Sequence, residues 1–156
     1  MASSANAVTS AKLKIRKARR DDAERIALLC GELGYPATAA QITTRLRQLT
    51  PVSKHAVFVA ESADVDTSLI GWLHVSVSHL LESDIRAEVN GLIVAEGQRS
   101  AGAGAKLLEA AEEWARRRGC QGMNVRSNVI RERAHGFYER NGYEHYKTQK
   151  AFRKAL

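Results

Sequence analysis

The spacing of apolar residues changes several times along the chain, and each change predicts a new element. Residues 13–18 alternate apolar and basic side chains, which is typical of a short, half-buried strand. Over 23–33 the apolar residues recur every three or four positions, which predicts an amphipathic helix. Asp21, with Glu24 three residues later, has the pattern of a capping box, so we expect Asp21 to open this helix.

A second helix is expected directly after the first, and the period then changes to that of strands. Thr38 and Gln41 repeat the capping pattern ahead of an apolar stripe that ends before Pro51. Three runs joined by short polar links follow, which predicts an antiparallel meander over residues 55–62, 69–81 and 85–95.

The remainder of the chain alternates helix and strand. A long helix is expected to begin near Gly102, and its apolar positions are Leu107, Leu108, Ala111, Trp114 and Ala115. A short strand (122–127), a helix (131–141) and one or two closing strands within 143–156 complete the prediction. Helices and strands in this order predict the α/β (α+β) class, with a mixed, mostly antiparallel sheet flanked by helices. We expect residues 1–11 to form a disordered tail and residues 12–156 a single domain.

Asn90 and Gly91 interrupt the third run of the meander and allow two interpretations. An interior glycine weakens ordinary strand pairing and is typical of a bulge. Asn-Gly is also a common hairpin turn. The apolar run continues without a break to Val94, which favours the bulge.

Charge is distributed unevenly and the cysteines are few. The net charge is +7, and residues 99–156, which carry 13 basic and 6 acidic side chains, account for all of it. A basic half favours a polyanionic partner, either a nucleic acid or a phosphate-rich cofactor, although solvated surface charge is the alternative.

Cys30 and Cys120 lack metal-type spacing and are expected to be reduced core thiols, which favours the cytoplasm. No apolar run approaches the roughly 18 residues of a membrane span, so no membrane association is expected.

The segment "QRSAGAGAKLL" places two glycines between a strand and a helix. The first amides of a helix have no intrahelical partner and carry partial positive charge, and small residues let a phosphate approach them. The chain lacks the P-loop pattern, and Gly102 and Gly104 lack the third glycine of the dinucleotide fingerprint. The segment therefore indicates either an anion site of another kind or a plain tight turn.

Two segments resemble motifs of the GNAT acyltransferase superfamily. In "LIVAEGQRSAGAGAKLL", Arg99, Gly102 and Gly104 fill the pyrophosphate-loop pattern [QR]-x-x-G-x-[GA]. Downstream, "SNVIRERAHGFYERNGY" is similar to the second cofactor motif of that superfamily. One departure is Ser100-Ala101, where many relatives have a Gly-Arg-like pair. The resemblance covers residues 13–150 and implies a GNAT fold whose sheet is splayed between its fourth and fifth strands.

The resemblance also implies a cofactor, acetyl-CoA, and the residues that bind it. The backbone of strand residues Leu92, Ile93 and Val94 would pair with the pantetheine arm like an added strand. The pyrophosphate would lie on the loop and first helical turn, formed by Arg99, Ser100, Ala101, Gly102, Ala103, Gly104 and Ala105. In the second motif the implied contacts are Asn128, Arg131 and Tyr138, and Asn128 is also expected to be the N-cap of its helix.

Transfer of an acyl group to an amine needs a base, an oxyanion donor and an acid. By the resemblance, Tyr138 is the acid that reprotonates the CoA thiolate, with a core tyrosine as the alternative. The oxyanion donor would be a backbone amide near Leu92–Val94. Glu88 would be the base, with a solvent-facing glutamate as the alternative. His79, His74 and Glu82 are further candidates, and many relatives have no dedicated base.

The sequence therefore predicts an N-acetyltransferase that moves an acetyl group from acetyl-CoA to a primary amine of a small molecule or protein, by direct attack in a ternary complex. No metal and no nucleic acid are expected, and a homodimer is possible. The competing function is a non-catalytic module that binds acyl-CoA or, through its basic half, nucleic acid. Against nucleic acid, aromatic residues do not interleave with the basic ones, and no helix-turn-helix or zinc spacing is present.

Overall fold

A computed structural model describes residues 12–64, 69–99 and 101–156. The predicted tail 1–11 and Ser100 lie outside these residues. The elements are β1 (Leu13–Lys17), η2 (Arg20–Asp22), α1 (Ala23–Leu33), α2 (Ala39–Leu49), β2 (His55–Ser62), β3 (Leu69–Ser78), β4 (Arg86–Val94), η3 (Glu96–Gln98), α3 (Ala103–Arg117), β5 (Met123–Val125) and α4 (Glu132–Arg140). The chain forms two compact units, Met1–Val125 and Arg126–Leu156, and each is described by itself.

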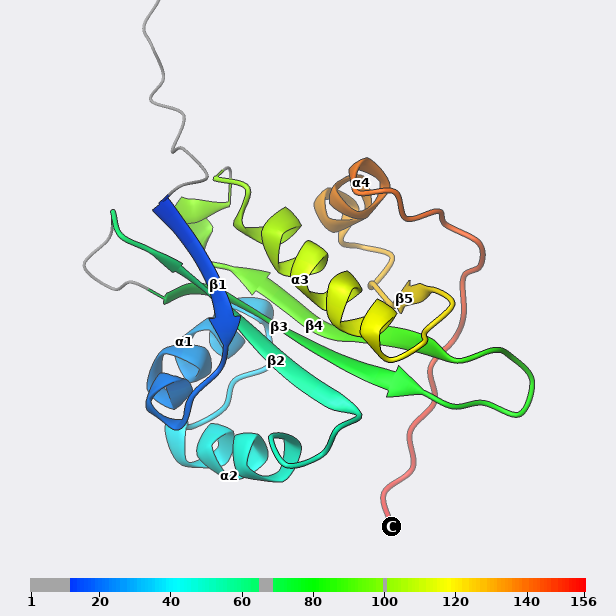
Figure 1. Ribbon diagram of the computed structural model, residues 1–156, viewed down its shortest axis with the longest axis horizontal. Helices are drawn as coiled ribbons and strands as arrows, with labels where there is room; N and C mark the ends of the chain where they lie inside the picture. The colour runs from blue at the N-terminus through cyan, green and yellow to red at the C-terminus, as the bar shows by residue number, and fades with distance from the viewer. Residues whose placement is uncertain (1–11, 65–68, 100) are drawn as a thin grey trace, which may run out of the picture. The chain divides into compact units, whose positions relative to one another are not determined.

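The first unit contains a five-stranded sheet with the order β1-β2-β3-β4-β5 (Figure 1). Strands β1 to β4 pair antiparallel, and β5 pairs parallel with β4. The mixed, mostly antiparallel sheet is thus confirmed. Strand β5 pairs only with Ala87–Val89, so in the described part of the chain Asn90–Val94 have a strand neighbour on the β3 side alone. The fourth and fifth strands therefore separate at Asn90.

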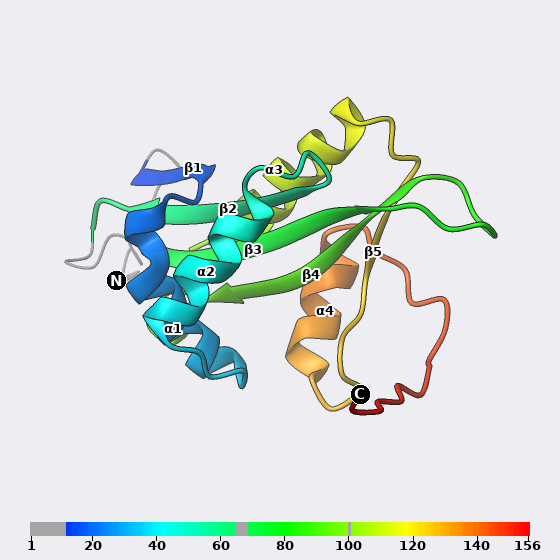
Figure 2. The same cartoon turned by 90° about the horizontal axis from the view of Figure 1, so that it is seen from below.

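Helices cover both faces of the sheet (Figure 2). On one face α1 and α2 pack on apolar side chains of the sheet. This cluster contains Ile26, Leu29, Ile42, Leu46, Val59, Leu69, Ile93 and Ala95. On the other face α3 packs on the strands, and Leu107 lies so close to Gly71 that a side chain there would contact it at 3.4 Å. The apolar residues that recur every three or four positions in the sequence thus form the buried sides of the helices on both faces of the sheet.

A bulge interrupts the pairing of β3 with β4. His74 is opposite Gly91 and Val75 is opposite Val89, which leaves Asn90 as the extra residue. The prediction of a bulge is confirmed and the hairpin alternative is wrong, because β4 runs unbroken from Arg86 to Val94. The bulge also moves the buried positions of β4 from one face of the sheet to the other. Gly91 leaves room for the indole of Trp72, whose ring carbons would lie 2.8 Å from a Cβ at position 91.

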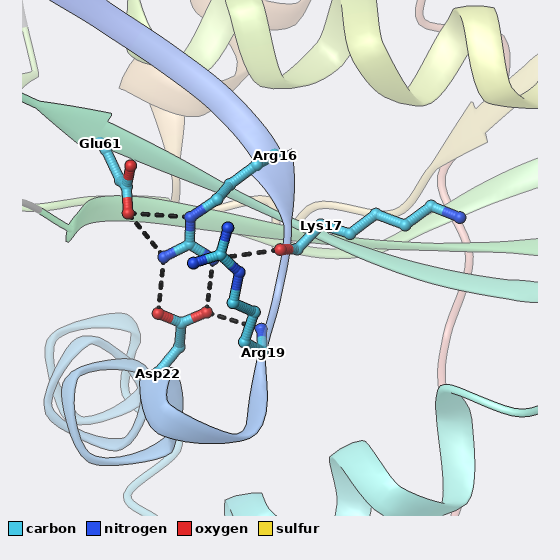
Figure 3. Close-up of polar contacts among 5 residues, drawn as sticks. All are labelled: Arg16, Lys17, Arg19, Asp22 and Glu61. Atoms are coloured by element: carbon cyan, nitrogen blue, oxygen red, sulfur yellow. Dashed lines mark hydrogen bonds and ion pairs between the residues drawn. The ribbon is translucent and has the colours of Figure 1, made fainter.

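A largely buried ion-pair cluster joins β1 to the start of α1 (Figure 3). The guanidinium of Arg16 donates to both carboxylate oxygens of Asp22, at 2.8 Å each, and to Glu61. The amide of Arg19 donates to Asp22 at 2.7 Å. The predicted cap at Asp21 is wrong: α1 begins at Ala23 after a short 3-10 turn, because Asp22, rather than Asp21, points back to Arg16. The capping box of Thr38 and Gln41 at α2 is confirmed.

The second unit consists of α4 and the segments that flank it. Residues 143–156 form neither helix nor strand, and all but Tyr143 are exposed. The predicted closing strands are therefore wrong. Four of these residues are basic, namely Lys147, Lys150, Arg153 and Lys154, and the exposed Phe152 and Leu156 bury no apolar face. Without an apolar face the segment lacks what stabilises a half-buried strand.

Candidate active site

The open edge of β4 presents main-chain groups in a defined direction. The amide of Ala95 donates to the Ile70 carbonyl at 2.7 Å, so Ala95 faces β3. Main-chain groups alternate sides along a strand, so Ile93 also faces β3, whereas Leu92 and Val94 face the open edge. In agreement, the Ile93 carbonyl lies 2.8 Å from a Cβ built on Gly71 of β3. Leu92 and Val94, two of the three residues predicted to pair with the pantetheine arm, thus face the open edge of β4, where a ligand can pair like an added strand.

The loop after β4 leads from this edge to the N-terminus of α3. Arg99 Nε donates to the Val94 carbonyl at 3.1 Å, which ties the loop to the end of the strand. The amide of Ala101 donates to Gln98 at 3.3 Å. Gly102 is the N-cap of α3, with φ of 81° and ψ of 7°, and no atom lies within 4 Å of a Cβ built there. The predicted start of the helix near Gly102 is confirmed.

The first turn of α3 has the properties of an anion site. No side chain caps it and it contains no acidic residue. The first intrahelical bond runs from Lys106 to the Gly102 carbonyl at 3.1 Å, so the amides of residues 103–105 have no acceptor within the helix. Ala103 is buried, and Gly104 and Ala105 are half-buried. Small side chains, free amides and the positive end of the helix dipole together favour a phosphate at this position.

Glu88 lies on β4 before the bulge, in a row of polar residues that crosses the sheet. It is opposite Ser76 of β3 on one side and Asn124 of β5 on the other. Ser76 is in turn opposite His55 of β2. Directly opposed residues share a face of the sheet, so these four side chains lie on one face. All four are half-buried.

Two further residues belong to this polar row. Asn90 Nδ2 donates to Ser76 Oγ at 2.8 Å, so the bulge residue holds the serine hydroxyl. His55 Nδ1 and His74 Nε2 lie 3.0 Å apart, and the two rings stack with centroids 5.3 Å apart. Burial, together with the nearby charge of His55, lowers the pKa of His74 to about 4. Of the other candidate bases, His79 and Glu82 are exposed between β3 and β4, outside the row.

The second unit holds Tyr138, Asn128 and Arg131. Tyr138 lies on α4 and packs edge-on against Phe137 and Tyr143, with ring centroids 5.2 and 5.8 Å away. Burial raises the pKa of Tyr138, and the charge of Arg131 opposes this only in part. The phenol is therefore protonated at neutral pH.

Asn128 stabilises a turn ahead of α4. Its Oδ1 accepts from the Ile130 amide at 3.1 Å, and its carbonyl accepts from the Arg131 amide and from His135 Nε2. The predicted N-cap role of Asn128 is wrong, because the helix begins at Glu132 with Arg131 in the N-cap position. A side chain that bonds to the amide two residues later forms an Asx turn instead.

Sequence reasoning missed His55, Ser76, Asn90 and Asn124 as members of a site. Pairing register brings them together, and register depends on the bulge at Asn90. The alternation in "HVSVSH" places His74 and Ser76 on one face of a strand, but it does not show which residues lie across from them.

Among the described residues, no group of three or more His, Cys, Asp or Glu side chains is arranged to hold a metal ion. Among the same residues, no helix has the length and apolarity that crossing a bilayer requires.

Comparison with known proteins assigns this arrangement to a family. Residues 32–143 match the acetyltransferase (GNAT) family. The chain is 30% identical over 146 residues to the aminoalkylphosphonate N-acetyltransferase of Salmonella typhimurium, covering 88% of this chain and 90% of that protein.

Solved structures show the same fold. Aminoglycoside N-acetyltransferase AAC(6')-Iy in complex with CoA superposes with a TM-score of 0.80 at 18% identity, over 92% of this chain and 95% of that one. Glucosamine-6-phosphate N-acetyltransferase from Arabidopsis thaliana gives a TM-score of 0.76 at 18% identity, over 90% and 97%.

A sheet that opens at its fourth strand and leads into an uncapped, glycine-bearing helix start defines an acyl-CoA-dependent acyltransferase. The chain belongs to the GNAT acetyltransferase family. It is an N-acetyltransferase that uses acetyl-CoA as the acyl donor.

Proposed function

We propose that the chain acetylates a primary amine of a small molecule by direct attack on acetyl-CoA in a ternary complex. The observation that carries this proposal is the continuity of the open β4 edge with the uncapped first turn of α3. Such an arrangement holds an extended, phosphate-bearing thioester with its reactive end beside β4. Acetyl-CoA supplies the activated acetyl group, and the protein residues supply position and proton transfer.

Leu92 and Val94 hold the pantetheine arm through their outward main-chain groups in this proposal. The amides of residues 103–105 hold the pyrophosphate, and the open space at Gly102 leaves room for a phosphate oxygen. Arg99 fixes the loop through its bond to Val94. Ser100 lies outside the described residues and remains a predicted contact. Asn128 and Arg131 of the second unit remain predicted contacts of the cofactor as well.

Tyr138 is the proposed acid. As the carbon–sulfur bond of the thioester breaks, the departing thiolate needs a proton, and a phenol kept protonated by burial can donate it. The amide of Leu92, which faces the open edge, is the proposed donor to the developing oxyanion.

Glu88 is the proposed base that takes a proton from the acceptor ammonium. It is half-buried on β4, three residues before Gly91 and at the point where the β4–β5 pairing is about to end. Its row of polar neighbours occupies the face on which α1 and α2 pack further along the sheet. The acceptor amine is therefore proposed to bind on this face, opposite the one covered by α3.

An amine panel with acetyl-CoA tests the proposed function by following release of free CoA thiol. The panel contains an aminoalkylphosphonate, an aminoglycoside and glucosamine 6-phosphate, because relatives act on these classes. Amine-dependent thiol release that falls at least tenfold in Glu88→Gln supports the proposal. Thiol release that no amine stimulates contradicts it.

The competing function, a binding module without catalysis, is separated by ligand-induced thermal shifts. Acetyl-CoA is expected to raise the melting temperature, and a short DNA duplex is not. Stabilisation by the duplex alone would favour the nucleic-acid module suggested by the basic half of the chain.

We also propose a single domain over 12–156, a cytoplasmic location and a homodimer. Cys30 and Cys120 are both free thiols, which fits a reducing compartment. Measurement of the mass in solution by light scattering tests the dimer.

A further inference from the structure

The stacked pair His55–His74 has no part in the function proposed so far. Two imidazoles 3.0 Å apart can share only one hydrogen, so one ring must donate and the other accept. Both rings are half-buried on a sheet face that is otherwise apolar toward α1 and α2.

The relay argued below requires one of the two directions of this hydrogen bond. Burial keeps His74 uncharged, and a neutral imidazole can accept at Nε2, so we take His74 as the acceptor. His55 then donates through Nδ1–H, and its Nε2 keeps a lone pair that can take a proton. When His55 is protonated, the same hydrogen bond stabilises the imidazolium. His74 thus has the role of the group that fixes the tautomer of His55.

The polar row connects this basic nitrogen with Glu88. His55 is directly opposite Ser76, and Ser76 is directly opposite Glu88. Directly opposed Cβ atoms lie about 5 Å apart, within reach of side-chain hydrogen bonds. Because Ser76 Oγ accepts from Asn90, its hydroxyl hydrogen is available to donate to another neighbour.

Two cations lie at the start of β2. Lys54 directly precedes the strand, and Arg118, at the end of α3, donates to the Ser53 carbonyl at 3.0 Å. Both are cations, and neither can accept a proton from an ammonium at neutral pH. Glu88, across Ser76, is the acidic group of the row.

We propose that His55, positioned by His74, receives through Ser76 the proton that Glu88 takes from the acceptor amine. The proposal rests on the proposed function. The ammonium loses one proton to the Glu88 carboxylate. Glu88 passes a proton to Ser76 Oγ as the Ser76 hydroxyl hydrogen moves to His55 Nε2, and half-exposed His55 releases it to water. No oxidant or further reactant is needed, and Glu88 is ready for the next turnover.

The tautomer is tested first, on the free wild-type protein, by ¹⁵N NMR of the histidine side chains. The expected result is His55 protonated at Nδ1 and His74 bearing a lone pair at Nε2. A His55 protonated at Nε2 alone would overturn the proposal, independently of any activity.

Variants then test the relay against the best amine of the panel. His55→Gln and Ser76→Ala are each expected to lower kcat about 10- to 100-fold, with the KM for acetyl-CoA unchanged. Ser76→Thr, which keeps a hydroxyl, and His74→Gln, whose amide oxygen can accept from His55, should retain most of the rate. His74→Leu, which has no acceptor for the His55 hydrogen, should lower the rate. His145→Gln, in the exposed segment after α4, is the matched control and should behave as wild type.

The pH profile separates this role from a structural one. His55→Gln should change the pH profile of kcat, because the proton must then leave Glu88 by another route, whereas a purely structural role would leave the profile unchanged. Unchanged kcat and an unchanged profile in His55→Gln would overturn the relay and leave the proposed function standing. No thiol release with any amine would overturn both. Melting and acetyl-CoA binding show whether His55→Gln folds. If it does not, the NMR tautomer of His55 and the comparison of Ser76→Ala with Ser76→Thr test the relay.

Discussion

The carboxylate of Asp22 binds the guanidinium of Arg16 through two parallel hydrogen bonds of 2.8 Å each, within a largely buried cluster. Glu61 binds the same guanidinium, so two carboxylates share one cation. Bonds of this bidentate kind fix direction as well as distance. The pair sets the position of α1 on the sheet, and α1 contributes to the face proposed for the acceptor.

Asp22→Asn is expected to lower the free energy of unfolding by about 2 kcal/mol, because it removes one of the two carboxylates that accept charge-assisted hydrogen bonds from Arg16. Denaturant titration at pH 7 measures the loss. Asp21→Asn is the matched control: Asp21 is exposed, and the change should stay within about 0.5 kcal/mol. Equal losses in the two variants would contradict a specific role of Asp22.

The contribution of Asp22 should also depend on pH. Burial raises its pKa, but the hydrogen bonds from Arg16 and from the Arg19 amide outweigh that effect and hold the pKa below the ordinary value of 3.8. A carboxyl whose pKa is lowered by folding stabilises the native state above its unfolded pKa, and the stabilisation is lost as pH falls through the folded pKa. The stability difference between wild type and Asp22→Asn should therefore be full at pH 6 and shrink below about pH 4. A difference independent of pH would contradict this assignment.

Gly91→Ala and Gly31→Ala should change stability in opposite directions. A Cβ at position 91 would lie 2.8 Å from two ring carbons of Trp72, so the indole must move and about 1–2 kcal/mol should be lost. At position 31, on the exposed side of α1, nothing lies within 4 Å, and alanine should add about 0.5–1 kcal/mol. Denaturant titration measures both. A stabilising Gly91→Ala would show that Trp72 is not held over the bulge.

Gly102→Ala should weaken acetyl-CoA binding about tenfold, because a methyl group would occupy the space proposed for the pyrophosphate. Gly119→Ala is the control: both glycines have positive φ, 81° and 76°, and nothing lies within 4 Å of either Cβ. Each variant should lose about 1 kcal/mol of stability from the left-handed backbone. Calorimetric titration should find weaker acetyl-CoA binding in Gly102→Ala alone. Equal acetyl-CoA affinities of the two variants would show that the pyrophosphate does not bind at Gly102.

The parts of the fold that the sequence predicts are those with local causes. The stripe of Leu107, Leu108 and Ala111, the capping box at Thr38 and the bulge at Asn90 each depend on residues close together in the chain. The predicted cap at Asp21 is wrong because Arg16, six residues before Asp22, binds the Asp22 carboxylate, a contact that the capping pattern does not contain. The predicted closing strands are wrong because residues 143–156 bury no apolar face.

The candidate site likewise has one part that the sequence predicts and one part that it does not. Arg99, Gly102 and Gly104 form a contiguous motif that any reading of the sequence can find. The row of His55, Ser76 and Glu88 joins three strands through pairing register, and one residue inserted or removed at the bulge would change which side chains meet. Residues that a site collects from several strands therefore become visible only in the structure.

Tyr138→Phe should lower kcat about 100-fold and leave the acetyl-CoA dissociation constant within about threefold of wild type. The substitution keeps the ring and its packing against Phe137 and Tyr143, so the loss reports the hydroxyl. Because burial raises the pKa of Tyr138, the acid remains protonated at neutral pH, and kcat should decline only as pH rises above 10. Tyr146→Phe, at an exposed ring, is the control. A rate in Tyr138→Phe equal to that of the control would show that another group, or water, reprotonates the thiolate.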